Sequence, residues 1–595
     1  YIPIRLGKIL MKGNSICRKK GYNKNVRNKL LDRKISRREA LSTAAKVGVG
    51  VVVAGVVGGV AGYFAGSATA PTKTVTSTVV STIEKTKTVT KTVAVTSTAT
   101  ETTATIPWKR DFSGVTLTVS TLSGPYVANT HYWVRESWQK ETGGKIEVVE
   151  IPWGEFLTKL IVPLSRGEYP YDIITIGPYF HMPDVIDAIV PIDDFVKKDP
   201  GLRWDDFLKG VQDMCKWGGH IVALPMDGDS RILYFRKDLV MNEDHRKEFK
   251  KKYGYDMPDP VRGPLTWKEL IDLCEFFNGW DWNNDGKPEI GFPSSDFGRY
   301  GFNVLMDLAC FYKPPELEPG YLPHISYFFD PDTMEPLIDN PGWVKALATL
   351  KELYERGSDP SVLKEGYAPR EVMVGDGGFA TIDYGDIGQI ELGPESKVKG
   401  KLSYTIIPGA EEVYDWKQEK WIKVKSVHPI PEPKEYDLNF APHHAFGGWV
   451  LAITKGCAKK GEKYLLAAYD YIRTIASPEW SIKLVTDYTR KTGANPFRES
   501  HFKWEEWARY GYPDPNYVKA QIETMNHPNK AVDLRIPGVT EYLDRLAYWM
   551  YQCISADVDP EEAMKNAASE WKQITEKRGK DVQLKYYRQS IGLPT

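Results

Sequence analysis

Aromatic side chains and short carboxylates are the residues of this 595-residue sequence whose types and spacing point most directly to chemistry. Asp227 and Asp229 stand two positions apart, so in an extended segment their carboxylates point to the same side. Trp153 and Trp449 offer flat apolar faces. A carbohydrate presents apolar C–H faces ringed by hydroxyl groups, and aromatic plates beside carboxylates match that surface. For any one aromatic taken alone, packing in the core is the alternative.

The elements that must position these side chains are short strands followed by amphipathic helices. Strand-like runs at 115–122, 145–151 and 171–176 alternate with helical patterns at 131–142 and 156–164, which predicts a mostly parallel sheet covered by helices. Ligands of such sheets bind beyond the carboxyl ends of the strands. Of the residues that we predict to bind the ligand, this rule selects Gly124, Tyr126, Trp153, Pro178 and Tyr179. The others are polar, aromatic or glycine residues from later segments: Asp227, Asp229, Arg231, Asp383, Tyr384, Gly448 and Trp449.

A second α/β unit is predicted after Arg231. Thr266 and Glu269 have the spacing of a capping box, which marks the start of its first helix. Two further amphipathic helices are expected near the end of the sequence, at 540–555 and 560–578.

The charge distribution excludes one class of partner. Residues 1–46 hold 14 Lys and Arg against Asp32 and Glu39, and the remainder holds 64 basic and 76 acidic residues, a net charge of −12. Such a balance repels phosphate backbones, so no nucleic acid is expected as a partner. The six cysteines lack metal-binding spacing and are expected to be mostly buried free thiols, with room for one bridge.

The first hundred residues have the composition of an export signal and a tether. A twin arginine, Arg37-Arg38, precedes an uncharged stretch at 47–66 that is long enough to span a bilayer as a helix of about 30 Å. Residues 71–107 form a Thr-rich stalk. We expect the basic leader 1–46 to stay in the cytoplasm and the rest to lie outside the cell, anchored by 47–66 or released after cleavage.

Several segments, in order, carry a resemblance to the family 1 extracellular solute-binding proteins of the archaeal type. Residues 171–178 with 192–195 are similar to the family's third-strand region and its "I-x-P-L-D-D-F" segment. Residues 223–239 are similar to its crossover between lobes, "P-x-x-x-D…L-Y-Y-R-K-D-L". Residues 266–270, 447–449 and 560–563 with Trp571 also match. The stretch 411–442 departs from the pattern by its length.

The resemblance implies an α/β, two-lobed, periplasmic-binding-protein-like clamp of type II with multiple hinge crossovers. One lobe would take 114–231 and 447–505, and the other 232–446 and 506–590. Such a clamp closes on a solute and delivers it to an ABC permease with its ATPase subunits. The implied protein is a monomer and not an enzyme, and its ligand is a carbohydrate, with a neutral oligosaccharide favoured over a peptide or polyamine.

No cofactor is required, but one segment resembles a calcium loop. Asp281, Asn283, Asp285, Lys287 and Glu289 fall at loop positions one, three, five, seven and nine, with Gly286 at the sixth. Position twelve is Phe292, where such loops carry a bidentate Glu. A structural Ca²⁺ and a metal-free polar turn both remain open.

Two other functions stay open from the sequence. An exported glycoside hydrolase would also need aromatic plates and two carboxylates, although Asp227 and Asp229 are too close in sequence to flank a sugar. A module that senses glycans, or binds peptides or polyamines, without transport would use the same residues.

Overall fold

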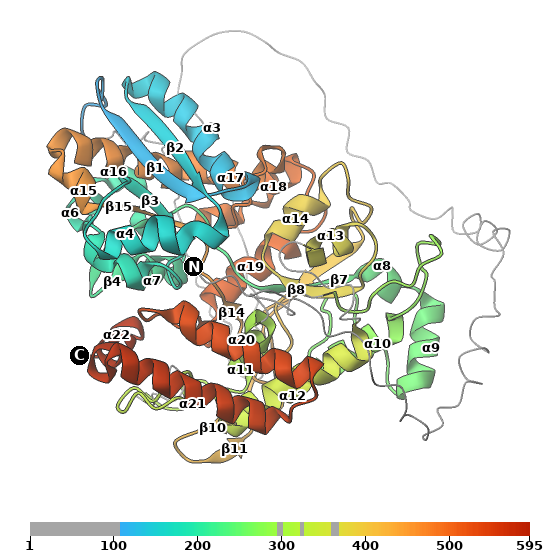
Figure 1. Ribbon diagram of the computed structural model, residues 1–595. Helices are drawn as coiled ribbons and strands as arrows, with labels where there is room; N and C mark the ends of the chain where they lie inside the picture. The colour runs from blue at the N-terminus through green and yellow to red at the C-terminus, as the bar shows by residue number, and fades with distance from the viewer. Residues whose placement is uncertain (1–106, 294–301, 320, 322–326, 359–367) are drawn as a thin grey trace, which may run out of the picture. The chain divides into compact units, whose positions relative to one another are not determined.

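The computed structural model describes residues 107–293, 302–319, 321, 327–358 and 368–595 (Figure 1). All of them belong to the second of two compact units, Ala99–Thr595. The predicted leader, apolar stretch and most of the stalk lie outside the described residues.

The first sheet has five strands in the order β2-β1-β3-β15-β6. Strand β1 pairs in parallel with β2 and β3, whereas β15 runs antiparallel to both β3 and β6. All four residues of β3 are buried, as expected for a strand covered on both faces. The strands are β1 (Thr116–Leu122), β2 (Lys145–Ile151), β3 (Ile173–Ile176), β6 (Leu224–Pro225) and β15 (Val450–Ile453).

The strands predicted at 115–122, 145–151 and 171–176 are confirmed within two residues at each end. The first helix, α3 (Pro125–Thr142), begins six residues before the predicted start because Pro125 occupies its first turn, where a missing amide hydrogen is tolerated. It ends at Gly143, whose φ of 72° is left-handed.

The second sheet has three strands, and both outer strands are antiparallel to the central one, β7 (Ile232–Arg236). The outer strands are β8 (Ala380–Asp383) and β9 (Leu402–Thr405). Helix α10 (Trp267–Phe277) starts where the capping box predicts: Thr266 accepts a hydrogen bond from the Glu269 amide at 3.2 Å. The Glu269 carboxylate accepts from the Leu265 amide at 2.6 Å.

The last helices of the chain belong to a layer of packed helices. Helices α20 (Val539–Ser555) and α21 (Pro560–Arg578), as predicted, pack on each other and against α12 (Pro341–Gly357), as Figure 1 shows. Helices α11 (Phe302–Phe311) and α22 (Lys580–Ser590) adjoin them. The long stretch 411–442 forms two hairpins, β10 (Val413–Asp415) with β11 (Lys420–Ile422) and β12 (Ser426–His428) with β13 (Lys434–Tyr436).

The other described elements are shorter or peripheral: η1 (Trp153–Glu155), η2 (Leu157–Ile161), α4 (Val162–Ser165), α5 (Met182–Val185), η3 (Ile186–Ala188), α6 (Asp193–Lys198), η4 (Pro200–Leu202), η5 (Trp204–Asp206), α7 (Lys209–Met214), β4 (Lys216–Trp217), β5 (His220–Ile221), α8 (Lys237–Val240), α9 (Glu243–Tyr253), α13 (Ala368–Val374), α14 (Asp386–Glu391), β14 (His443–His444), α15 (Lys455–Lys459), α16 (Glu462–Ala476), α17 (Pro478–Thr486), η8 (Tyr488–Arg490), η9 (Glu499–Phe502), α18 (Trp504–Arg509), α19 (Asn516–Asn526) and β16 (Ala531–Val532).

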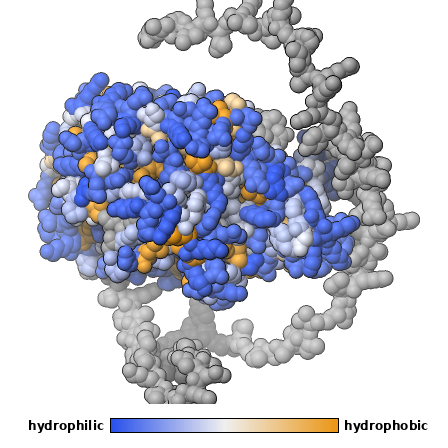
Figure 2. Space-filling view, turned by 90° about the horizontal axis from the view of Figure 1, so that it is seen from below, coloured by the Kyte–Doolittle hydropathy of each residue, from blue (hydrophilic) through white to orange (hydrophobic). Residues whose placement is uncertain are grey.

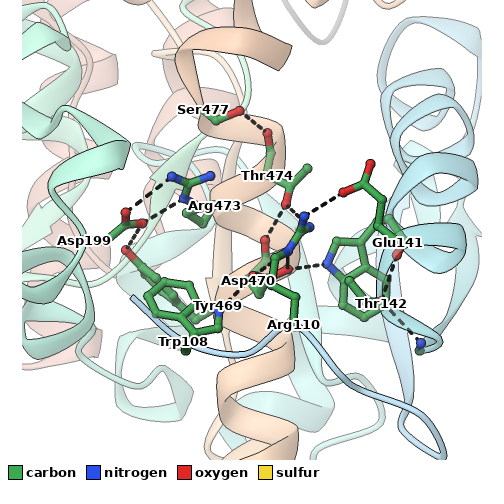
Figure 3. Close-up of polar contacts among 12 residues, drawn as sticks. Trp108, Arg110, Glu141, Thr142, Asp199, Tyr469, Asp470, Arg473, Thr474 and Ser477 are labelled. Atoms are coloured by element: carbon green, nitrogen blue, oxygen red, sulfur yellow. Dashed lines mark hydrogen bonds and ion pairs between the residues drawn. The ribbon is translucent and has the colours of Figure 1, made fainter. Parts of the chain in front are cut away.

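The first described residues contact α16 through one buried carboxylate, which accepts hydrogen bonds and forms an ion pair (Figure 3). Asp470, fully buried, accepts hydrogen bonds from the indoles of Trp108 at 2.9 Å and Trp138 at 2.7 Å. It also pairs with the Arg110 guanidinium at 3.0 Å. Residues just after the predicted stalk are therefore part of the packing around α16.

The described cysteines, Cys215, Cys274, Cys310, Cys457 and Cys553, are all buried and free, in agreement with the expectation of free thiols. Among the described residues, none of the helices combines the length and apolar character needed to cross a bilayer. The face seen in Figure 2 is largely hydrophilic, with apolar residues scattered over it.

Candidate functional site

The aromatic part of the candidate site lies at the carboxyl ends of β2 and β3. The ring centroids of Trp153, half-buried after β2, and Trp449, just before β15, are 6.3 Å apart at an interplanar angle of 87°. His181 and Phe446 pack against both. Two tryptophans separated by almost 300 positions thus form one cluster: Trp153 follows the end of β2, as the strand-end rule predicts, and Trp449 joins it from just before β15.

Two glycines bring the aromatic cluster next to the predicted carboxylates. Gly447 and Gly448 have φ angles of 79° and 81°. A Cβ on Gly448 would lie 2.5 Å from the Asp227 carbonyl oxygen, and one on Gly447 would lie 2.6 Å from the Tyr179 ring. Only glycine fits this close approach, so the Trp449 backbone lies directly against the segment that carries Asp227 and Asp229.

Both carboxylates bond to the same residue, Asn495. The backbone N–H of Asn495 donates to Asp227 Oδ1 at 2.6 Å, and its side-chain Nδ2 donates to Asp229 Oδ1 at 2.8 Å. The same Nδ2 also lies 3.2 Å from Oδ1 of Asp386, at the start of α14. Segments around residues 228, 386 and 495 therefore converge on a single polar group.

The pKa values of the two aspartates reflect that convergence. Burial, followed by the nearby Asp386 carboxylate, raises the pKa of Asp227 to about 8. Burial and the charges of Asp227 and Asp386 raise the pKa of Asp229 as well. Burial therefore disfavours the charged forms of both carboxyl groups more than their hydrogen bonds to Asn495 favour them.

Arg370, from α13, joins two other acidic groups of the site. Its Nε and Nη2 donate to Asp383 at 2.9 and 2.8 Å, and its Nη1 donates to Asp386 at 2.6 Å. Burial disfavours the charged form of Asp383 and raises its pKa, but the charge and hydrogen bonds of Arg370 have the larger combined effect and lower the pKa of that carboxyl. Asp383 also accepts from the Tyr384 amide at 2.7 Å.

The remaining predicted ligand-binding residues lie in different surroundings. Gly124 is the N-cap of α3, and the backbone of Tyr126 lies against Gly493, two residues from Asn495. Tyr179 is buried, with the Arg535 guanidinium 5.9 Å from its ring, and the Pro178 carbonyl accepts from Arg535 at 3.0 Å. These last two contacts place Pro178 and Tyr179 against the core.

Arg231 points to a buried ion network. Its Nε and Nη2 both lie 2.8 Å from Asp307 Oδ2, while its guanidinium lies 5.2 Å from the Tyr384 ring centre. His443 bridges Asp307 and Asp533, at 2.7 Å from each. Burial opposes a charged imidazole, but the two carboxylates outweigh it and raise the pKa of His443 to about 9.

The predicted calcium loop has a compact acidic side. One oxygen from each of Asp281, Asp285 and Glu289 lies within 4.8 Å of the others. Asn283 and Asp281 accept backbone hydrogen bonds from Asp285, as in a tight turn, and Lys287 donates its amide to Asp285. Burial and the two neighbouring carboxylates raise the pKa of Glu289 to about 7. Calcium binding stays a prediction.

The sequence reasoning missed Asn495, Asp386 and Arg370. Each belongs to a segment distant in sequence from Asp227, and none stands in a motif that marks a ligand contact. The one available signal was the turn-forming run of residues 493–496, Gly-Ala-Asn-Pro, at the end of the segment assigned to the first lobe.

Comparisons with known proteins agree with this fold. Residues 123–277 match the family model of the bacterial extracellular solute-binding proteins. The chain is 23% identical over 369 residues to the sn-glycerol-3-phosphate-binding periplasmic protein UgpB of Salmonella typhimurium, covering 58% of this chain and 64% of that protein. It is 24% identical over 146 residues to a probable ABC transporter-binding protein of Deinococcus radiodurans, covering 24% and 29%. The chain thus spans less than two thirds of these relatives.

Solved structures share the architecture. A ribitol complex of an ABC transporter solute-binding protein from Agrobacterium radiobacter K84 superposes with a TM-score of 0.57 at 20% identity, covering 78% of this chain and all of that one. Maltose-bound MalE3 of T. maritima gives 0.55 at 19% identity, covering 77% and 100%.

The fold is therefore the α/β fold of the type II periplasmic binding proteins, as predicted. Within this fold, residues 123–277 are similar to the bacterial extracellular solute-binding proteins. The family and these structural neighbours are substrate-binding proteins and not enzymes.

Proposed function

We propose that this protein binds a sugar or oligosaccharide outside the cytoplasm and delivers it, chemically unchanged, to an ABC importer. The observation that carries the proposal is the contact of two surfaces: the Trp153–Trp449 cluster and the Asp227–Asp229 pair, joined through Gly448. Aromatic faces pack on the C–H faces of a sugar, and carboxylates accept from its hydroxyl groups. The ribitol and maltose complexes named above support a polyol or sugar as ligand.

The mechanism follows from where the polar groups originate. Asp227 and Asp229 follow β6 of the first sheet, whereas Asp383 ends β8 of the second and Asp386 begins α14. A solute that first lies on Trp153 and Trp449 and then engages Asp386 binds the closed clamp more tightly than the open one. That difference in affinity drives closure. No covalent step is involved.

Calorimetric titration of the full chain with mono- and oligosaccharides tests the proposal. Trp153→Ala and Trp449→Ala should each weaken binding by about 2 kcal/mol, roughly thirtyfold, because each removes a central aromatic contact. Trp549→Ala is the matched control: this half-buried tryptophan on α20 bonds to Glu570, away from the site. Equal losses in all three variants, or hydrolysis of the saccharide, would contradict the proposal.

The cellular setting is part of the proposal. The twin arginine and the apolar stretch support export and anchoring of residues after 70 outside the membrane, and the family supports a permease with ATPase subunits as the partner. We propose a monomer as the binding unit. Cell fractionation with an antibody to the folded unit tests the location: recovery in the cytosol would contradict it.

A further inference from the structure

The polar side of the site carries more carboxyl groups and hydrogen-bond acceptors than a neutral sugar needs. Asp227, Asp229 and Asp386 meet at Asn495, and each is less than a tenth exposed. Among the described residues, neither Asp227 nor Asp229 forms an ion pair, and the cation that contacts Asp386, Arg370, is shared with Asp383. The group therefore holds carboxyl groups that no cation among the described residues balances in full.

Two buried amide oxygens independently add hydrogen-bond acceptors that have no donor. The side chains of Asn495 and Gln521 are fully buried, and neither Asn495 Oδ1 nor Gln521 Oε1 has a hydrogen-bond partner among the described residues. Both converge on Gly385: a Cβ there would lie 1.8 Å from Asn495 Oδ1 and 2.1 Å from Gln521 Oε1. The nitrogens of these amides are already used, by Asp229 and by the Tyr517 carbonyl. An unpartnered buried acceptor is costly and calls for a donor.

From this arrangement we infer that the ligand is an amine-bearing saccharide, whose ammonium group binds among Asp227, Asp229 and Asp386 while its rings pack on Trp153 and Trp449. The inference rests on the proposed function and specifies its substrate class. A protonated amine supplies both missing features, a positive charge and several donors directed to acceptors. A hydroxyl group supplies one donor and no charge.

The charge state of the site gives this inference a second readout. The raised pKa of Asp227, about 8, means that much of this group is protonated at neutral pH. An ammonium beside it favours the charged carboxylate, so binding expels a proton into the buffer. A neutral sugar gives no such drive.

The test is a calorimetric titration of the full chain with three trisaccharides of one β-1,4 backbone: the glucosamine trimer, its N-acetylated form and cellotriose. They differ only at C2, which bears an ammonium, an amide or a hydroxyl group. We expect the glucosamine trimer to bind at least about tenfold more tightly than cellotriose. Its binding heat should vary with the ionisation enthalpy of the buffer, which reports proton release. Spermidine, a cation without sugar rings, should bind more weakly.

Substitutions of the site's aspartates test whether these groups cause the preference for the amine. Asp227→Asn and Asp229→Asn should reduce the preference for the amine at least about threefold, whereas Asp205→Asn, an exposed acid in η5, should leave it unchanged. Equal or tighter binding of cellotriose would overturn the inference and leave the proposed function standing. No binding by any of the three trisaccharides would overturn the inference alone, whereas tightest binding of spermidine would overturn both.

Discussion

At the scale of single residues, the fold contains buried charged side chains that each contact side chains of opposite charge. His443 is the clearest case, because Asp307 and Asp533 flank it at 2.7 Å and Arg231 neutralises the remaining charge of Asp307. Arg231 precedes β7, and His443 precedes the segment that returns to β15, so this network lies where the chain passes between the two sheets.

The protonated His443 makes stability depend on pH. Its pKa rises from 6.5 to about 9 on folding, so its stabilising contribution is complete below pH 6.5 and is lost as pH rises through 9. We expect the melting temperature of the full chain to fall over this window, and to fall less in His443→Gln. Thermal denaturation from pH 6 to 9.5 measures the difference. An identical slope in both proteins would show that His443 is not charged when folded.

Gly448 is the residue on which the geometry of the site depends most. Gly448→Ala introduces a Cβ 2.5 Å from a carbonyl oxygen at a φ of 81°, so the backbone must move. We expect saccharide affinity to fall at least about tenfold, together with a loss of stability larger than that of the control. Gly461→Ala, also at positive φ but in open space, is the control. Unchanged affinity in Gly448→Ala would contradict the placement of Trp449 in the site.

At the scale of elements, α16 joins the start of the folded unit to the first sheet. Asp470→Ala would leave the indole N–H groups of Trp108 and Trp138 without an acceptor and would remove one of the two carboxylates paired with Arg110. The expected cost is about 3 kcal/mol of unfolding free energy. Chemical denaturation measures it, with Asp205→Ala as an exposed control. A loss as small as that of the control would mean that residues 108–110 do not pack on α16 in solution.

The loop 281–289 gives a second prediction at this scale. The pKa of Glu289, raised to about 7, means that the ligand-free loop loses stability as pH rises from 4.5 through 7, because three carboxylates then repel one another. Millimolar Ca²⁺ should raise the melting temperature at pH 7.5 more than at pH 5, and Glu289→Gln should reduce the gain. No shift with Ca²⁺ relative to chelator at pH 7.5 would exclude the metal.

Signals within a few neighbouring residues predicted where strands and helices form. Contacts between segments distant in sequence determined how the strands pair and which side chains meet at the site. The β-rich runs of β1 and β2 and the Thr266 cap were readable because they depend on a few neighbouring residues. The antiparallel insertion of β15 beside β3 was not, since its partner lies almost 300 positions away. The strand-end rule found Trp153, which follows β2, whereas Trp449 precedes β15 and was predicted from its side-chain type and the resemblance of 447–449. Asn495 had only the turn-forming run 493–496, which marks no ligand contact.

At the scale of the whole molecule, two sheets from interleaved segments contribute to one candidate site. The chain passes from the first sheet to the second after Asp229 and returns before Trp449. A small rotation about these passages changes the distance between the groups from each sheet, and a solute that contacts both sets favours their approach.

The most direct test of the account is the distance between spin labels on Lys140→Cys in α3 and Lys247→Cys in α9, two exposed positions that fall in different predicted lobes, measured by pulsed electron paramagnetic resonance. A saturating saccharide should shorten and narrow that distance distribution, and Trp153→Ala with Trp449→Ala should abolish the change at the same saccharide concentration. A distribution that stays the same while calorimetry shows the saccharide bound would contradict closure of the protein around its solute.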